Sequence, residues 1–362
     1  MIATRRLVML GCLSVLGAVG GCASTPGTPA GDGSGGTPAA TGGSSGSGSG
    51  GSNAGSGGNT GSGGATGTGG SVAPTGSGGA TTPKDGSVTD AVSEAPAGDG
   101  STGVYVPPPP NPSAGCGMPA TETLSTYVQK NIMSGGVART YRIYMPGGYS
   151  STRAYPLIIL GHGCGGAGGT PFPIEGVTKT EAIVVALKSV GDCFEYSPTG
   201  PDVTYFDNVL AEVSAGHCVD KARVFMAGFS SGSWLTHTIG CVRAGIVRAQ
   251  GNASGNQVNL PMCKGPIAAL FAHDVNDDQN SFAGAEVARN RILKSNGCSM
   301  TDTVPYDWDG DPATPSTCVS YQGCMPGYPV VWCPTMAPPG QPTHNNHVPI
   351  TTVGLWRFWK QF

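Results

Sequence analysis

The sequence predicts an α/β fold over residues 114–362, with a mostly parallel central sheet flanked by helices. Short, continuous apolar runs recur in this region, as expected for strands buried on both faces of a parallel sheet. Segments with apolar residues at helical spacing alternate with these runs, which is the pattern of βαβ units. A region of roughly 250 residues is long enough for one such domain.

The first part of the chain has a different composition. Residues 1–21 contain two arginines near the start, the apolar run Leu7–Val19 and then Gly20-Gly21, which is the organisation of a secretory signal peptide. Cys22 follows directly, as in bacterial lipoproteins. We therefore expect acylation of Cys22 and attachment to a bacterial membrane at the cell surface. Plain cleavage and release, with Cys22 incidental, is the alternative.

Residues 22–113 consist mainly of Gly, Ser, Thr, Ala and Pro, with almost no large apolar side chain. Such a segment cannot bury enough surface to offset its ordering entropy, so we expect a disordered linker. The net charge of −3 says little about partners, because this low-charge segment dilutes the whole chain. The lack of a basic patch with interleaved aromatics argues against a nucleic-acid partner.

The cysteines indicate an oxidising environment. An even number in an exported domain predicts disulfides, up to five here, although sequence does not reveal their pairing. No C-x-x-C pair occurs, so a zinc finger is not expected. Three alternating aspartates, Asp307, Asp309 and Asp311, lack the spacing of a calcium loop and predict an acidic turn; we expect no metal and no cofactor. Of the twelve cysteines, Cys12 lies in the signal segment and Cys22 is the expected acylation site. The ten in residues 114–362 are Cys116, Cys164, Cys193, Cys218, Cys241, Cys263, Cys298, Cys318, Cys324 and Cys333.

The first predicted elements lead to a glycine-rich loop. Arg139–Pro146 alternates polar and apolar residues and predicts a half-buried strand, whereas Tyr155–Leu160 predicts a fully buried one. The loop Gly161–Gly166 follows, and glycines there let the backbone approach a substrate. We expect the N–H of Cys164 to be an oxyanion donor; the alternative is a tight turn in which His162 only packs.

The next elements surround a G-x-S-x-G motif. A strand over Ala182–Leu187 and an amphipathic helix over Asp202–Ala215 precede the apolar run Val224–Ala227. Gly228-Phe-Ser-Ser-Gly232 comes next, followed by a segment with helical periodicity. G-x-S-x-G between a strand and a helix is the nucleophile elbow of α/β-hydrolases. This predicts Ser230 as the nucleophile, with the N–H of Ser231 as the second oxyanion donor.

A catalytic acid is expected after the next strand, because the order in this fold is Ser, acid, His. Pro266–Ala272 predicts that strand, and Asp274, Asp277 and Asp278 follow it. The function of the acid is to orient the base and stabilise the imidazolium. Position alone leaves the three aspartates as alternatives. A helix is predicted over Gly284–Ser295.

A base is expected between the last strand, predicted over Tyr328–Trp332, and an apolar terminal helix that contains Leu355. His344 and His347 both lie in this loop. We favour His347, because it is nearer the helix that would support the loop, and keep His344 as the second choice.

Several of these pieces together resemble carbohydrate esterase family 1 and the polyhydroxybutyrate-depolymerase-like esterases, which include feruloyl and acetylxylan esterases. The resemblance covers about residues 139–362. It implies that the acid lies in a His-Gly-x-x-Asp pattern, which places it at Asp277 after His273, with Asp274 in place of the glycine. The family's Gly-His motif for the base lacks its glycine here. The matching pieces are Gly161–Gly165, Val219–Gly232, Asn296–Cys298, Cys318–Cys324 and Pro329–Cys333.

The sequence therefore predicts an exported serine esterase with Ser230 as nucleophile, His347 as base and Asp277 as acid. The resemblance implies a carboxylic ester substrate, with feruloyl esters of plant cell-wall xylan favoured. A polyhydroxybutyrate depolymerase or an acetylxylan esterase is the alternative within this class. A non-catalytic surface protein that binds glycans is the alternative from another class. The oligomeric state is not readable from the sequence.

Overall fold

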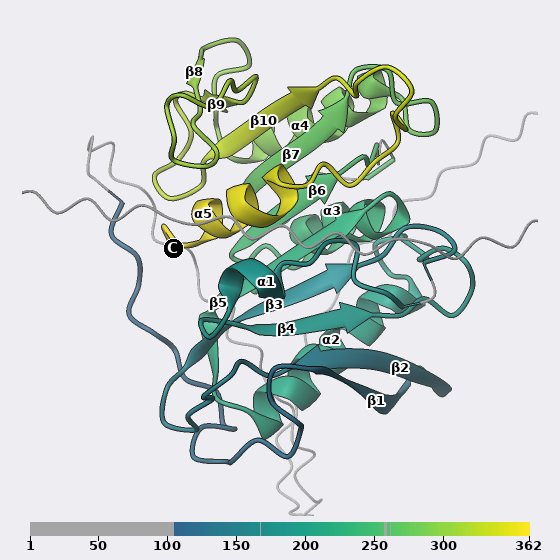
Figure 1. The fold of residues 1–362 in the computed structure, drawn as a ribbon, viewed down its shortest axis with the longest axis vertical. Coiled ribbons are helices and arrows are strands. Elements are labelled where there is room, and N and C mark those ends of the chain that lie inside the picture. The colour runs from purple at the N-terminus through teal and green to yellow at the C-terminus, as the bar shows by residue number, and fades with distance from the viewer. Residues whose placement is uncertain (1–104, 167, 257–258, 261) are drawn as a thin grey trace, which may run out of the picture. The chain divides into compact units, whose positions relative to one another are not determined.

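The computed structural model describes residues 105–362 except 167, 257–258 and 261. Its centre is one sheet with the strand order β1-β2-β4-β3-β5-β6-β7-β10-β9-β8 (Figure 1). The strands are β1 (Tyr127–Ser134), β2 (Val137–Tyr144), β3 (Tyr155–Gly161), β4 (Ile183–Leu187), β5 (Val219–Phe229), β6 (Ala249–Ala253), β7 (Ala268–Asp274), β8 (Thr303–Pro305), β9 (Val319–Tyr321) and β10 (Val330–Thr335).

The inner strands run parallel to one another and the outer ones antiparallel. The continuous parallel part consists of strands β4, β3, β5, β6, β7 and β10. Antiparallel pairing adds β2 and β1 at one edge and β9 and β8 at the other. The predicted α/β fold with a mostly parallel sheet is confirmed. Parallel strands align their carboxyl ends, so the loops that follow β3, β5, β7 and β10 meet at one end of the sheet.

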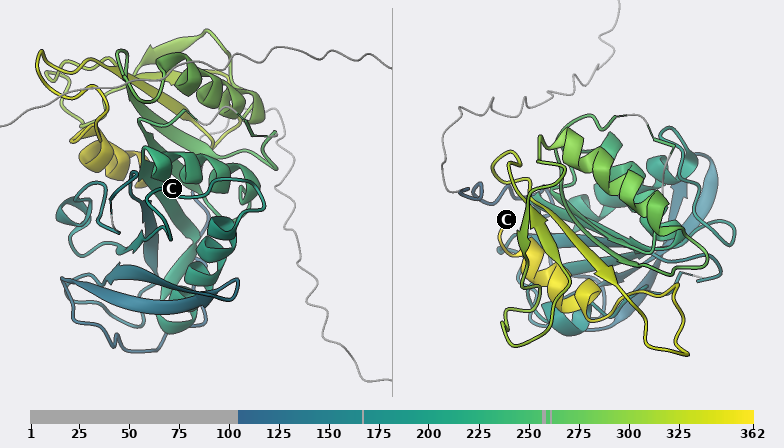
Figure 2. Two further views of the ribbon diagram at one scale, coloured as in Figure 1. Left: turned by 90° about the vertical axis from the view of Figure 1, so that its right-hand side faces the viewer. Right: turned by 90° about the horizontal axis from the view of Figure 1, so that it is seen from above.

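Helices cover both faces of this sheet (Figures 1 and 2). On one face Val209, Leu235 and Ile292 belong to a single apolar core. On the other face Phe225 stacks on Trp359 with ring centroids 5.1 Å apart. The first face carries α2 (Pro201–Gly216), α3 (Ser231–Val242) and α4 (Phe282–Ser295); the second carries α1 (Glu175–Thr178), a π-helical turn (Ile350–Gly354) and α5 (Leu355–Trp359).

Four strands have no counterpart in the sequence prediction: β1, β6, β8 and β9. Strand β6 reads Ala-Gln-Gly-Asn-Ala, which has neither the apolar run nor the β-branched residues of a typical strand. All five of its residues are buried between β5 and β7. A Cβ at Gly251 would lie 2.5 Å from Leu355 Cδ2, so the close packing of the terminal helix requires a small residue there.

Five disulfides use all ten cysteines of the domain, as their even number predicted. The pairs are Cys116–Cys218, Cys164–Cys193, Cys241–Cys263, Cys298–Cys324 and Cys318–Cys333. Disulfides close loops and so restrict the unfolded chain, which stabilises the folded state. Such cross-links are typical of extracellular domains.

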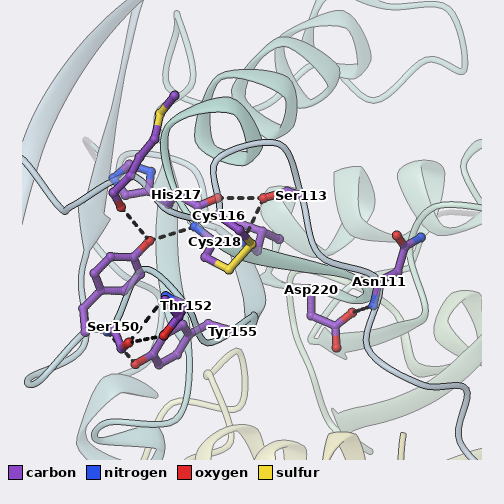
Figure 3. The surroundings of a disulfide bond; sticks show 12 residues. Asn111, Ser113, Cys116, Ser150, Thr152, Tyr155, His217, Cys218 and Asp220 are labelled. Atoms are coloured by element: carbon purple, nitrogen blue, oxygen red, sulfur yellow. Dashed lines mark hydrogen bonds between the residues drawn. A yellow bond between two sulfur atoms is a disulfide. The ribbon is translucent and has the colours of Figure 1, made fainter.

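The domain begins earlier in the chain than the predicted boundary at Ala114. The N–H of Asn111 donates to Asp220 Oδ1 at 2.8 Å, and Ser113 Oγ donates to the carbonyl of His217 at 2.7 Å, beside the Cys116–Cys218 disulfide (Figure 3). Tyr105 packs edge-on against Phe362. The boundary was misplaced because proline- and serine-rich composition does not reveal backbone pairing.

The predicted signal peptide at residues 1–21, the predicted acylation site Cys22 and most of the predicted linker lie outside the described residues. Within the described residues, no helix has both the length and the apolar character needed to cross a bilayer.

Candidate active site

Ser230 occupies the sharp turn between β5 and α3. Its φ and ψ are 53° and −118°, a strained conformation for a residue with a side chain. The glycines on either side are required by close backbone packing: a Cβ at Gly228 would lie 2.2 Å from the Gly232 carbonyl, and one at Gly232 would lie 2.0 Å from the oxygen of Gly161. The Ser230 N–H donates to the carbonyl of Ala253 at 3.0 Å. This geometry is that of the nucleophile elbow predicted from G-x-S-x-G.

The glycine loop after β3 lies directly against this turn. A Cβ at Gly163 would be 3.3 Å from Ser230 Cβ. The hydroxyl of Ser231 donates to the carbonyl of His162 at 3.3 Å, which ties the elbow to the loop. The N–H of Cys164 makes no hydrogen bond to any described residue, and an N–H in the first turn of a helix, such as that of Ser231, has no intrahelical acceptor. Of the two donors predicted for the oxyanion, Cys164 therefore follows the residue that packs on Ser230, and Ser231 directly follows Ser230. Cys164 itself is bonded to Cys193.

Asp277 pairs with His344. The Nδ1 of His344 donates to both carboxylate oxygens at 3.0 Å. Backbone N–H groups of Gln279 and Asn280 donate to Oδ1 at 2.9 and 2.8 Å. Burial alone would raise the pKa of Asp277, but the hydrogen bonds from His344, Asn280 and Gln279 outweigh it and lower the pKa below its ordinary value. Asp277 is therefore a carboxylate at neutral pH.

The other two aspartates occupy different surroundings. Asp274 is fully buried and accepts the N–H groups of Asn276 and Ala337, so it joins the ends of β7 and β10. Asp278 is exposed. No hydrogen bond or ion pair of the described residues connects either of them with His344 or His347. Of the three candidates, Asp277 is the one that holds a histidine of the late loop.

The structure contradicts the preference for His347 as the partner of Asp277. The hydroxyl of Ser254 donates to the carbonyl of Asn345 at 2.9 Å, so it accepts from His347 Nε2 at 2.8 Å. Nδ1 of His347 then accepts from the Thr335 hydroxyl at 3.1 Å. Both ring nitrogens are occupied, and burial lowers the pKa of His347 to about 3. His347 therefore braces the loop through Ser254 and Thr335 and is not hydrogen-bonded to Asp277.

His344 lies beside the elbow. Its ring packs on Phe229, the residue before Ser230, with centroids 4.9 Å apart. With Nδ1 bound to a carboxylate, the proton is on Nδ1 and the lone pair is on Nε2. Within the described chain, no hydrogen bond joins the Ser230 hydroxyl to either histidine. Such bonds are often long without substrate and shorten in the complex.

His347 also faces a separate pocket. This pocket, of about 260 Å³, is bordered by Trp308, Thr335, His347 and Ile350, and Ser230 is not part of its lining. Among the described residues, no cluster of three or more His, Cys, Asp or Glu side chains is arranged to hold a metal ion.

Comparison with known proteins decides the family. The chain is 31% identical to feruloyl esterase D of Neurospora crassa over 275 residues, which cover 69% of this chain and 91% of that protein. The chain belongs to the feruloyl esterase family. It is also 29% identical to feruloyl esterase C of Emericella nidulans, over 65% of this chain and 92% of that one. The family resemblance read from the sequence motifs is confirmed.

Comparison of structures supports the fold. An acetyl xylan esterase from Aspergillus awamori superposes with a TM-score of 0.51 at 14% identity, over 65% of this chain and all of that one. This likeness shows a shared α/β-hydrolase fold. No protein-family model matches the chain.

Some residues of this feruloyl esterase site were not found by sequence reasoning. Phe229, which packs on His344, is the variable position of G-x-S-x-G and carried no signal. Ser254 and Thr335 hold His347 from the ends of β6 and β10, and isolated hydroxyl residues have no recognisable pattern. His162 was considered only as a packing residue, although it begins the His-Gly pair of the glycine loop.

Proposed function

We propose that this chain is a serine esterase in which Ser230 is the nucleophile, His344 the general base and Asp277 the acid that orients it. The N–H groups of Cys164 and Ser231 form the oxyanion hole. The observation that supports this most strongly is the hydrogen-bonded pair of Asp277 and His344, which lies against the residue next to the strained Ser230.

The geometry suits a two-step acyl transfer. Nε2 of His344 takes the proton as Ser230 Oγ attacks the ester carbonyl, and the carboxylate of Asp277 stabilises the imidazolium. The developing oxyanion is bound by the two backbone N–H groups, and the positive end of α3 adds to this stabilisation. His344 then protonates the departing alcohol. A water activated by the same nitrogen releases the acid and restores the serine.

The substrate that we propose is a feruloyl ester of a plant cell-wall polysaccharide. Relatives named feruloyl esterase that match most of this chain support this choice. An oriented base beside a strained serine is a costly arrangement for a protein that only binds glycans, so it argues against the non-catalytic alternative.

Hydrolysis of methyl ferulate by the purified full chain tests the proposal. We expect turnover by the natural protein and none above background by Ser230→Ala, while its circular dichroism and Tm stay unchanged. Ser150→Ala, at an exposed serine, is the matched control and should keep full activity. Absence of turnover on any aryl ester would refute the proposal.

Two further substrates test the acyl preference. Acetylated xylan and polyhydroxybutyrate are assayed beside methyl ferulate, and we expect the highest kcat/KM for the feruloyl ester. A preference for acetylated xylan would leave the Ser230–His344–Asp277 machinery in place but change the substrate class. Release of hydroxybutyrate as the fastest reaction would indicate a depolymerase.

We also propose that residues 1–21 direct export and that Cys22 is acylated. The segment between Cys22 and Tyr105 would then tether the domain to the lipid anchor. The charged, apolar and glycine-rich start supports export, and five disulfides are in keeping with an oxidising compartment. Fractionation of expressing bacterial cells tests the anchor. The natural chain should be in the membrane fraction and Cys22→Ala in the soluble or secreted fraction; equal distribution of both would contradict acylation.

A further inference from the structure

A buried histidine of the glycine loop has no part in the proposed proton transfers. His162 follows β3 and is only 2% exposed. Its ring packs against Phe194 with centroids 4.6 Å apart. Two charged side chains, Asp202 and Lys188, interact electrostatically with its ring, and the hydroxyl of Ser189 lies near its Nε2. Its position two residues before Cys164 suggests a role in the oxyanion loop.

The hydrogen bonds of His162 determine which nitrogen carries the proton. The backbone N–H of Ser189 can only donate, and it does so to His162 Nε2 at 3.2 Å. The hydroxyl of Ser189 donates its own proton to the carbonyl of Gly191. Nε2 is therefore the unprotonated nitrogen. Burial lowers the pKa of His162, which keeps the ring neutral with its proton on Nδ1.

Nδ1 of His162 lies 2.6 Å from the carbonyl oxygen of Gly163, to which it donates. The same carbonyl accepts the N–H of Gly166 at 3.0 Å. A Cβ at Gly166 would lie 2.8 Å from His162 Nδ1, so the turn closes over this bond only because a glycine is there. Two donors therefore hold the carbonyl end of the Gly163–Cys164 peptide.

The other end of that peptide is the N–H of Cys164. In a trans peptide the N–H and C=O point in opposite directions, so fixing the carbonyl also fixes the direction of the N–H. A hydrogen bond to the carbonyl also polarises the peptide and strengthens its N–H as a donor. On the other side of the turn, the Cys164–Cys193 disulfide and the bond from Gly165 N–H to Asp192 O limit its movement.

We propose that His162 is a positioning residue for the oxyanion hole: its Nδ1–H holds the Gly163–Cys164 peptide so that the Cys164 N–H is aimed at the oxyanion. This inference rests on the proposed serine esterase function. His162 does not touch the reacting atoms. It acts through the Gly163 carbonyl, and its contribution appears in the transition state rather than in substrate binding.

Three substitutions separate this role from packing. In His162→Asn the amide nitrogen can occupy the place of Nδ1 and still donate to Gly163. His162→Leu has a similar size but no donor. His162→Gln places its amide at the position of Nε2, toward Ser189, and leaves the Gly163 carbonyl without this partner. If the leucine variant does not fold, the asparagine and glutamine variants still form a matched pair.

Two quantities are measured for each variant: steady-state kinetics on methyl ferulate and the affinity for an aryl boronic acid. The boronic acid forms a tetrahedral adduct with a catalytic serine. Loss of one oxyanion donor costs about 10²–10³ in kcat, so a misdirected donor should cost about 10–100-fold. We expect that loss in kcat for His162→Leu and His162→Gln, with KM nearly unchanged and boronate affinity lowered in parallel. His162→Asn should recover most of both quantities.

The outcomes separate the two proposals. If Ser230→Ala abolishes turnover but all three His162 variants keep the natural kcat, the positioning role is refuted and the esterase stands. If all three lose kcat and Tm equally, without recovery by asparagine, His162 is only a packing residue and the inference is again wrong. If the natural chain hydrolyses no ester, the proposed function fails and this inference fails with it.

Discussion

Replacing each late histidine by leucine should give opposite results at the two positions. His344→Leu removes the group that is hydrogen-bonded to Asp277, whereas His347→Leu removes the brace between Ser254 and Thr335. Leucine approximates the volume of the ring in both places, so packing changes are matched. The pair therefore tests which histidine is the base.

The expected magnitudes follow from what each side chain contacts. General acid–base catalysis contributes about 10²–10⁴ in rate, so His344→Leu should lose at least that factor in kcat, or about 3–5 kcal/mol of transition-state stabilisation. Its stability should change little, because Asp277 keeps two backbone donors. His347→Leu removes the ring partner of the Ser254 and Thr335 hydroxyls. Ser254 still donates to the Asn345 carbonyl, so the cost is about 1–3 kcal/mol for the one group left unsatisfied.

The assay combines initial rates on saturating methyl ferulate with thermal unfolding followed by circular dichroism. We expect His344→Leu to be inactive with a nearly natural Tm. His347→Leu should unfold at a lower temperature and keep most of its kcat while folded. The assignment of the base is refuted if His347→Leu is inactive but stable and His344→Leu still turns over.

Three other perturbations give further checks. Asp277→Asn should lower kcat by about 10⁴ without unfolding the domain, because the histidine loses its orienting carboxylate; an unchanged kcat would exclude Asp277 as the acid. Gly232→Ala should lower both Tm and kcat, because its Cβ would lie 2.0 Å from the oxygen of Gly161 and force the elbow away from the glycine loop. Such overpacking should lower the free energy of unfolding by about 1–3 kcal/mol. A stable, active variant would contradict this packing. Lowering the pH from 6.5 toward 3 should lower the Tm. Burial lowers the pKa of His347, and of the buried His237 on α3, from 6.5 to about 3, so the unfolded chain binds protons before the folded one does. Each histidine contributes up to about 1.4 kcal/mol per pH unit to this loss of stability. A Tm that is constant over this range would show that these histidines are not held neutral in the folded state.

The sequence was sufficient for the parts of the site that depend on neighbouring residues. A strand, a turn that needs two glycines and a helix are all local features, so Ser230 and its elbow could be predicted from one short stretch. The loop after β3 was equally recognisable, because glycines there follow a buried apolar run. For the same reason the central strands β3, β4, β5, β7 and β10 were anticipated.

Only the tertiary structure shows which of His344 and His347 is hydrogen-bonded to Asp277. They are three residues apart in one irregular loop, and neither periodicity nor propensity states which ring turns toward Asp277. The choice depends on Ser254 and Thr335, which come from the ends of two other strands and hold His347 in place. Strand β6 and the start of the domain near Asn111 were missed for the same reason. Their pairing partners are distant in sequence, and the composition of these segments does not favour the structures that they form.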